Sequence, residues 1–186
     1  MGQRNSGYDR KEREFYATPA WVTQALIDHA VRLGNRGSIV WEPAAGSGAM
    51  TEVLRDNGFA VLASDITDGR DFLTWKPKTG FSGIVTNPPY GQHGALAMKF
   101  IMRALELTRP FYGFVAMLLR IDFDSALTRR CVFADFKPWA EKLVLTKRIV
   151  WFEQPGKRSD PSENHAWYIW NWHNVGKPII SYSKHP

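Results

Sequence analysis

The stretch that determines the fold runs from residue 38 to residue 65 and reads SIVWEPAAGSGAMTEVLRDNGFAVLASD. Its first five residues, 38–42, are mostly apolar and predict a short buried strand. A glycine-rich turn follows, and apolar spacing then predicts a helix around 49–57, ended by Gly58. Residues 59–64 predict a second strand that ends at Asp65. Strand, helix and strand in this order are typical of a parallel sheet with helices on its faces.

The same alternation extends on both sides of this stretch. Thr18-Pro19 predicts a helix start, with threonine as the N-cap and proline at the first helical position, and Gly34 or Gly37 ends that helix. Further along, the pattern predicts a strand at 82–86, a helix at 96–108, a strand at 113–119, a short helix near 124–132, and two strand-like runs at 142–152 and 165–172. Between the last two, 154–164 is rich in Pro, Gly, Ser and charge and predicts a loop.

Composition favours one globular domain. The chain has 186 residues, of which 44% are hydrophobic and 23% charged, which excludes disordered, collagen-like and low-complexity classes. The single cysteine, Cys131, excludes an internal disulfide framework and a cysteine-rich zinc site. The longest apolar run, 111–119, is far shorter than the roughly 20 residues of a membrane span, and the first residues lack the apolar core of a signal peptide. We therefore expect a soluble, cytoplasmic protein with no membrane partner.

Positive charge is concentrated in the second part of the chain. Residues 1–108 carry 12 basic and 11 acidic side chains, whereas residues 109–186 carry 12 basic and 7 acidic ones. Five of the eight tryptophans also lie in the second part: Trp139, Trp151, Trp167, Trp170 and Trp172. Cations bind phosphates and flat rings stack on bases, so this combination favours nucleic-acid binding. Tryptophans that simply fill the core are the equally weighted alternative.

The turn Glu42-Pro-Ala-Ala-Gly46-Ser-Gly48 is a candidate ligand-binding loop. Glycines let the backbone approach a ligand closely, and the helix that follows offers free N–H groups. Thr51 stands where a dinucleotide fingerprint requires its third glycine, which weakens a nicotinamide interpretation. Asp65 ends the next strand, where an acid accepts hydrogen bonds from ribose hydroxyls, and Asp71-Phe72 follows as a candidate pair for an adenine. A plain tight turn and a helix cap are the structural alternative; together, the features favour a nucleoside-containing ligand.

Asn87-Pro88-Pro89-Tyr90 directly follows the apolar strand at 82–86. Ligands of open α/β sheets bind beyond the carboxyl ends of strands, so we expect this tetrapeptide to lie beside the glycine turn. The Asn87 side-chain oxygen and the Pro88 carbonyl would accept both hydrogens of a weakly nucleophilic aromatic amine, and Tyr90 would stack on its base. Positioning and electrostatics then carry the reaction. A proline turn with a purely structural role is the alternative.

These motifs together resemble those of S-adenosylmethionine-dependent N6-adenine DNA methyltransferases, over roughly residues 16–125. Tyr16-Ala-Thr18-Pro19 is similar to the family's N-terminal cofactor motif, which closes over the methionine end of the cofactor. The turn at 42–48 is similar to its glycine loop, although Ala44 occupies a position where phenylalanine is usual. Asp65 matches the ribose acid, and Asn87-Pro-Pro-Tyr90 matches the asparagine form of the catalytic motif.

The resemblance implies a single Rossmann-like methyltransferase domain over 1–186, with a mostly parallel seven-stranded sheet, helices on both faces and an antiparallel edge. Residues 1–14 are expected to be flexible, and 120–186 to recognise the substrate. S-adenosylmethionine is the implied cofactor, with no metal. The implied catalytic residues are Asn87, Pro88, Pro89 and Tyr90, and the implied cofactor-binding residues are Tyr16, Thr18, Pro19, Glu42, Ala44, Gly46, Gly48, Asp65, Ile66, Asp71, Phe72 and Asn87.

We expect double-stranded DNA as the partner, with a short or relaxed recognition sequence, because little chain is left for a separate recognition domain. Seven basic residues are candidate phosphate contacts: Arg120, Arg129, Arg130, Lys147, Arg148, Lys157 and Arg158. The same tetrapeptide also serves enzymes that methylate RNA bases or protein glutamines, so these substrates remain alternatives. A catalytically silent nucleic-acid-binding module is a third possibility. A compact lone methyltransferase of this kind is typical of prokaryotes and phages.

Overall fold

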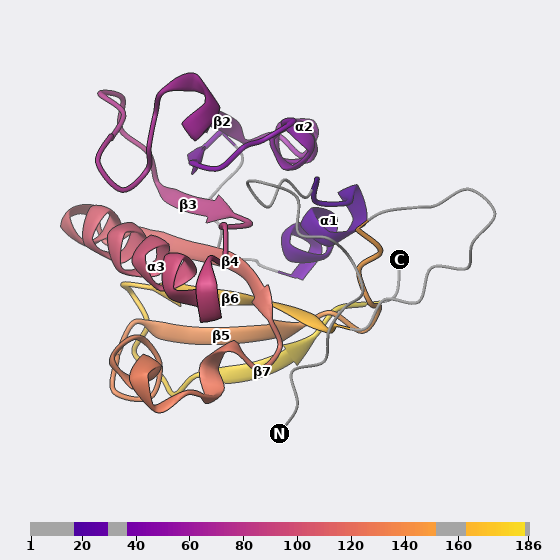
Figure 1. The fold of residues 1–186 in the computed structure, drawn as a ribbon, viewed down its shortest axis with the longest axis vertical. Helices are drawn as coiled ribbons and strands as arrows, with labels where there is room; N and C mark the ends of the chain where they lie inside the picture. The colour runs from indigo at the N-terminus through magenta and orange to yellow at the C-terminus, as the bar shows by residue number, and fades with distance from the viewer. Residues whose placement is uncertain (1–16, 30–36, 152–162, 185–186) are drawn as a thin grey trace.

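The structure is a computed structural model that describes residues 17–29, 37–151 and 163–184. It contains one sheet of seven strands with three α-helices (Figure 1). The strands are β1 (Ile39–Glu42), β2 (Ala60–Ala63), β3 (Gly83–Thr86), β4 (Phe114–Arg120), β5 (Trp139–Val144), β6 (His165–Asn171) and β7 (Ile179–Tyr182). The helices are α1 (Ala20–His29), α2 (Ala49–Asp56) and α3 (Ala95–Thr108).

The order of strands across the sheet is β2-β1-β3-β4-β6-β5-β7. Strands β2, β1, β3 and β4 run parallel to one another, and β6 runs antiparallel to both of its neighbours. The last pair, β5 and β7, is parallel. The predicted fold class is therefore confirmed: the sheet is mostly parallel, and its antiparallel strand lies towards one edge. All four carboxyl ends of the β2-β1-β3-β4 half consequently lie at the same end of the sheet.

Helices cover both faces of the sheet, as predicted (Figure 1). On one face α1 and α2 pack against the sheet, and the indole Nε1 of Trp167 in β6 donates to the carbonyl of Val22 in α1, 2.9 Å away. On the other face α3 places Phe100 and Ile101 against the aromatic and aliphatic side chains of β4 and β6. Two separate cores result, which together bury most of the apolar side chains of the strands and hold the strand ends in place.

The structure differs from the prediction in the last third of the chain. The strand predicted at 142–152 is β5, Trp139–Val144, and the apolar residues that follow it, Leu145 and Ile149, are buried without strand pairing. Strand β7 was not predicted as a strand, although the expected number of seven is correct. The short helix predicted near 124–132 consists of two 3₁₀ segments, Phe123–Ser125 and Leu127–Val132.

Within the described ranges, no helix is long and apolar enough to cross a membrane.

Candidate active site

The glycine loop joins β1 to α2 at the carboxyl end of the sheet. Gly46 and Gly48 have φ angles of 53° and 85°, in the left-handed region that glycine adopts without a steric penalty. Gly48 directly precedes α2, whose first turn leaves backbone N–H groups without helical partners. A Cβ atom added to Gly48 would meet nothing within 4 Å, so the space in front of this helix end is open. The loop therefore combines open space with the N-terminus of a helix, which is the kind of site at which acceptor atoms can bind.

Asp65 lies beside this loop, just after β2. Its Oδ2 accepts a hydrogen bond from the backbone N–H of Gly46 at 2.9 Å, and its Oδ1 accepts from the N–H and hydroxyl of Thr67 at 2.9 and 2.8 Å. Partial burial opposes ionisation, but the N–H groups of Thr67 and Gly46 outweigh it and lower the pKa of Asp65. The carboxylate is thus ionised at neutral pH and fixed against the glycine loop. Ile66 follows it with its side chain exposed.

Glu42, the last residue of β1, is a buried acid at the start of the glycine loop. Only 2% of it is exposed. Its Oε2 accepts a hydrogen bond from the hydroxyl of Thr51 in α2. The pKa of Glu42 is raised to about 7, mainly by burial, and the charge of Asp65 adds to this rise while the Thr51 hydrogen bond and Arg55 oppose it. The carboxyl group can therefore change its charge near neutral pH.

Asp71 and Phe72 follow the short 3₁₀ helix after Asp65 and have different environments. The Oδ1 of Asp71 accepts from the backbone N–H of Leu73 at 2.9 Å, and its side chain is partly exposed. Phe72 is 1% exposed, with ring centroids 5.1 Å from Trp41 and 4.8 Å from Phe100. The ring is therefore part of the core, and a nucleobase at this site would meet the backbone of Phe72. Its place in a cofactor site stays a prediction.

The tetrapeptide at 87–90 follows β3, which lies between β1 and β4 in the sheet. It therefore leaves the sheet at the same end as the glycine loop, on a neighbouring strand. The Nδ2 of Asn87 lies 3.2 Å from the hydroxyl oxygen of Thr18, to which it donates. Thr18 is buried just before α1, so the N-terminal motif and the tetrapeptide meet. Tyr16, from the same N-terminal motif, lies outside the described residues.

Tyr90 is half-buried and held from two directions. Its hydroxyl donates to the carbonyl of Leu118 in β4 at 3.4 Å. Its ring meets the edge of the Phe123 ring, with centroids 6.5 Å apart. Its own carbonyl accepts from the backbone N–H of Leu96, which ties the tetrapeptide to the first turn of α3. The position of the ring is thus set by β4 and by the segment that follows β4.

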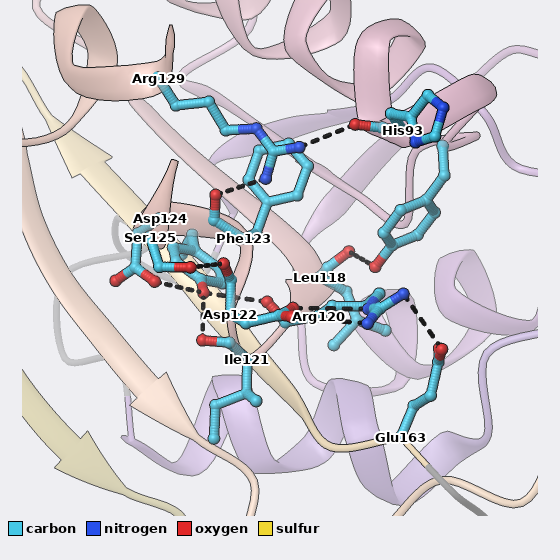
Figure 2. A network of polar contacts seen from close by, with 12 residues as sticks. His93, Leu118, Arg120, Ile121, Asp122, Phe123, Asp124, Ser125, Arg129 and Glu163 are labelled. Atoms are coloured by element: carbon cyan, nitrogen blue, oxygen red, sulfur yellow. Dashed lines mark hydrogen bonds and ion pairs between the residues drawn. The ribbon is translucent and has the colours of Figure 1, made fainter. Parts of the chain in front are cut away.

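The basic residues predicted to contact phosphate have varied surroundings. Arg120 pairs with Glu163 at 3.1 Å and with Asp122 at 3.4 Å, in the network drawn in Figure 2. Arg130 makes two hydrogen bonds to Asp135, at 3.0 and 2.9 Å. Surface pairs of this kind contribute little to stability and can be exchanged for a phosphate. These two arginines therefore remain candidates for nucleic-acid contact.

The other candidates are spread over the same half of the chain. Lys147 lies 5.4 Å from the ring centroid of Trp21, and Arg148 donates to the side chain of Asn164 at 3.0 Å. Arg129 turns inward and donates to two backbone carbonyls, a contact for which the sequence carried no signal because its partners lie in separate loops. The remaining two, Lys157 and Arg158, lie outside the described residues.

Within the described ranges, no group of three or more His, Cys, Asp or Glu side chains is arranged to hold a metal ion.

No family model matches the sequence, and no curated protein sequence matches it either. Solved structures do match the fold. A protein of Listeria monocytogenes, provisionally assigned as a class I S-adenosylmethionine-dependent methyltransferase, superposes with a TM-score of 0.64 at 11% identity, over 96% of this chain and 68% of that one. The fold described above is thus the fold of class I S-adenosylmethionine-dependent methyltransferases.

Two further neighbours come from restriction-modification systems. The type I methyltransferase subunit of Streptococcus thermophilus gives a TM-score of 0.60 at 13% identity, over 87% of this chain and 46% of that one. A modification subunit of Vibrio vulnificus, provisionally assigned to a type I restriction enzyme, gives 0.55 at 12% identity, over 97% and 49%. The present chain therefore spans about half the length of these two subunits.

Proposed function

We propose that this protein transfers a methyl group from S-adenosylmethionine to the N6 amine of adenine in DNA. One observation carries the proposal: the glycine loop and the Asn87 tetrapeptide leave neighbouring parallel strands, β1 and β3, at the same end of the sheet. The hydrogen bond between Asn87 and Thr18 adds the N-terminal motif to the same place. Ligands of open α/β sheets bind at this end.

The residues at the glycine loop fit S-adenosylmethionine by their chemistry. Asp65 is an ionised acceptor suited to ribose hydroxyls, and its bond to the N–H of Gly46 fixes it at the loop. The open space at Gly48 leaves room for the cofactor to approach the N-terminus of α2. We assign the methionine end to Thr18 and Pro19 and the adenine to Ile66, Asp71 and the backbone of Phe72. Glu42, the first residue of the loop, connects the loop to α2 because its carboxyl group accepts a hydrogen bond from the hydroxyl of Thr51.

When bound, the cofactor supplies an electrophilic methyl group on a sulfonium sulfur. The chain's own task is to present the amine. Because the Nδ2 of Asn87 donates to Thr18, its Oδ1 is the atom left to accept a hydrogen from an amine. The carbonyl of Pro88 accepts the second hydrogen, which turns the nitrogen lone pair towards the methyl group. As the nitrogen–carbon bond forms, the bond from the methyl carbon to the sulfonium sulfur breaks, S-adenosylhomocysteine leaves, and the nitrogen releases one of its protons to water. Tyr90 stacks on the base and fixes its plane.

DNA is the substrate that we favour. Residues 109–186 carry a net charge of +5 and follow the catalytic elements, so they are available to bind a polyanion. Two of the neighbours in fold are subunits of DNA restriction-modification systems. An adenine in a duplex must be flipped out at a cost of a few kcal/mol, and stacking on an aromatic ring offsets about 1–3 kcal/mol of it. We propose a short or relaxed recognition sequence.

Tritiated S-adenosylmethionine tests this proposal. The protein is incubated with the labelled cofactor and with separate pools of duplex DNA, RNA and protein, and the labelled nucleoside is identified after digestion. We expect label in the DNA pool, as N6-methyladenine. Asn87→Ala should lose transfer even at a cofactor concentration that calorimetry shows to saturate it. Label confined to protein, or transfer by the variant at the wild-type rate, would overturn the proposal.

Methyl transfer to an RNA base is a second candidate. It is favoured by a Pyrococcus horikoshii neighbour, provisionally assigned as an RNA methyltransferase, whose superposition covers 93% of this chain and 91% of that one with a TM-score of 0.54 at 17% identity. That neighbour is thus similar to the present chain in size as well as in fold. Label in the RNA pool with none in the DNA pool would select this candidate.

A further inference from the structure

The loop that follows the catalytic tetrapeptide has an unusual backbone. Gly91, His93 and Gly94 have φ angles of 63°, 52° and 78°. Glycine adopts the left-handed region freely, but a residue with a Cβ atom pays a steric cost there. His93 therefore holds a conformation that its own sequence does not favour, between the tetrapeptide and α3. Contacts from elsewhere in the fold must stabilise it.

Arg129 supplies the contact. It lies in the 3₁₀ segment Leu127–Val132, and its Nη2 donates to the carbonyl of His93 at 2.8 Å. Its Nη1 donates to the carbonyl of Phe123 at 2.6 Å, and its guanidinium carbon lies 3.7 Å from the centroid of the Phe123 ring. Figure 2 shows the guanidinium group over this ring, with one dashed line to each carbonyl. One side chain thus joins the loop after the tetrapeptide to the segment after β4.

The packing at this junction is tight. A Cβ atom added to Gly94 would lie 2.9 Å from the Nη2 of Arg129 and 2.9 Å from the Cε2 of Phe123, which is closer than real side chains approach. Phe123 is 3% exposed and meets the ring of Tyr90 edge-on. A displacement of the guanidinium group would therefore shift the backbone of the loop and, through Phe123, the ring of Tyr90, which we assign to stacking on the base.

The segment that carries Phe123 is itself anchored to the sheet. The hydroxyl of Tyr168 in β6 lies 2.9 Å from the carbonyls of both Arg120 and Ile121. Lys142 in β5 pairs with Asp124 at 2.8 Å, and both side chains are largely buried. The Phe123 end of the junction is thus fixed, so the bond from Arg129 restrains the loop at 91–94 against a rigid support.

We propose that Arg129 is a positioning residue for methyl transfer. It holds the loop at 91–94 in its left-handed conformation and, through Phe123, holds the ring of Tyr90 in the plane that the base requires. The inference rests on the proposed function, and it assigns to Arg129 a role different from the phosphate contact expected from the sequence. The two roles predict different kinetics, because a positioning residue acts on kcat and a phosphate contact acts on KM for the nucleic acid.

Arg129→Ala and Arg129→Lys test the proposal, with Arg103→Ala as the matched control. Arg103 lies in α3, where its partly buried side chain pairs with the exposed Glu106, and it takes no part in the junction. We expect Arg129→Ala to lower kcat roughly 10- to 100-fold, as misplaced reacting groups do, with KM for DNA unchanged. Lysine should fail to restore kcat, because a single ammonium cannot donate to both carbonyls and lie flat on the ring. Arg103→Ala should behave as the wild type.

Hydrogen exchange gives a readout that does not depend on catalysis. In Arg129→Ala, and to a lesser degree in Arg129→Lys, the amides of residues 91–95 should exchange about tenfold faster than in the wild type, while those of β4 keep their protection. If the wild type transferred no methyl group while Arg129→Ala still exchanged faster, the proposed function would be overturned, but the restraint of the loop at 91–94 by Arg129 would stand. Three results for Arg129→Ala would overturn the positioning role of Arg129: unchanged exchange, unchanged kcat, or a raised KM for DNA that Arg129→Lys restores.

Discussion

The carboxyl group of Glu42, at the end of β1, accepts a hydrogen bond from the hydroxyl of Thr51, in the first turn of α2. Both residues are 2% exposed. In sequence the whole glycine loop lies between them, so this bond closes the loop at its two ends. The acid that makes it has a pKa raised to about 7 by burial, which links the stability of the loop to pH.

Glu42 is expected to make the protein less stable as pH rises. Its pKa is raised from 4.5 to about 7 in the folded state, so between these values the folded protein binds the additional proton. The free energy of unfolding therefore falls as pH increases through this window, by on the order of 3 kcal/mol for a shift of this size. Glu42→Gln, which keeps a neutral group of the same shape, should abolish this component.

The measurement is urea unfolding of both proteins at intervals from pH 4.5 to pH 8. The difference between their free energies of unfolding isolates Glu42 from every other titrating group. We expect Glu42→Gln to gain stability relative to the wild type as pH rises. A difference that stays constant over this range would contradict a raised pKa at this position.

His165 is expected to act in the opposite direction. It lies at the start of β6, where its pKa is lowered to about 4, mainly by burial and also by the charge of Arg120. Its Nδ1 has no hydrogen-bond partner among the described residues. Because the unfolded chain binds the proton near pH 6.5, stability falls as pH decreases from about 6.5 to about 4, by on the order of 3 kcal/mol.

His165→Gln should remove this acid sensitivity. Thermal unfolding of the variant and the wild type at pH 7.5 and pH 4.5 gives the comparison, and the variant should lose less of its transition temperature on acidification. The contributions of Glu42 and His165 oppose each other in the wild type between about pH 4.5 and 6.5, so the variant isolates the one from His165. Equal acid sensitivity in the two proteins would show that folding does not lower the pKa of His165.

Asp65→Ala is expected to weaken the binding of S-adenosylmethionine. The carboxylate is held by Gly46 and Thr67 in an ionised state, and hydrogen bonds to a charged acceptor contribute about 1.5–3 kcal/mol, or roughly 10- to 100-fold in Kd. Asp68→Ala is the matched control, because that acid is exposed three residues further along the same turn. Calorimetric titration measures both affinities. If the two variants bound the cofactor equally well, Asp65 would not contact the ribose.

The parallel half of the fold could be predicted because its signals are local. The strand endings at Glu42 and Thr86 coincide with the predicted ones, since an apolar run stops there at a proline-containing turn. The bounds predicted for β5, 142–152, were wrong because Leu145 and Ile149 continue the apolar pattern into buried chain without strand pairing. Strand β7 was not predicted because three of its four residues are exposed, so its sequence lacks the alternation of apolar and polar residues that marks a half-buried strand.

Part of the candidate site could also be predicted, because some of its residues belong to local sequence motifs. Asn87 and Gly48 belong to short motifs whose spacing relates them to strand ends, and the rule that ligands bind beyond the carboxyl ends of parallel strands brings them together. The role of Arg129 could not be predicted, because its partners His93 and Phe123 lie on separate loops and accept through backbone carbonyls. Every residue has a backbone carbonyl, so the residue types at 93 and 123 do not indicate that these carbonyls accept from Arg129. Only the folded structure reveals the contact.

Tyr90 is expected to act through its ring rather than its hydroxyl. The hydrogen bond from the hydroxyl to the carbonyl of Leu118 is long, at 3.4 Å, whereas the ring lies against the edge of the Phe123 ring. Tyr90→Phe keeps the ring, so its kcat/KM for methyl transfer should stay within about threefold of the wild type. Tyr90→Ala removes the stacking surface, worth about 1–3 kcal/mol per base, and should lower kcat/KM roughly 10- to 100-fold. Steady-state kinetics on duplex DNA measure both, and a loss in Tyr90→Phe as large as that in Tyr90→Ala would assign the function to the hydroxyl.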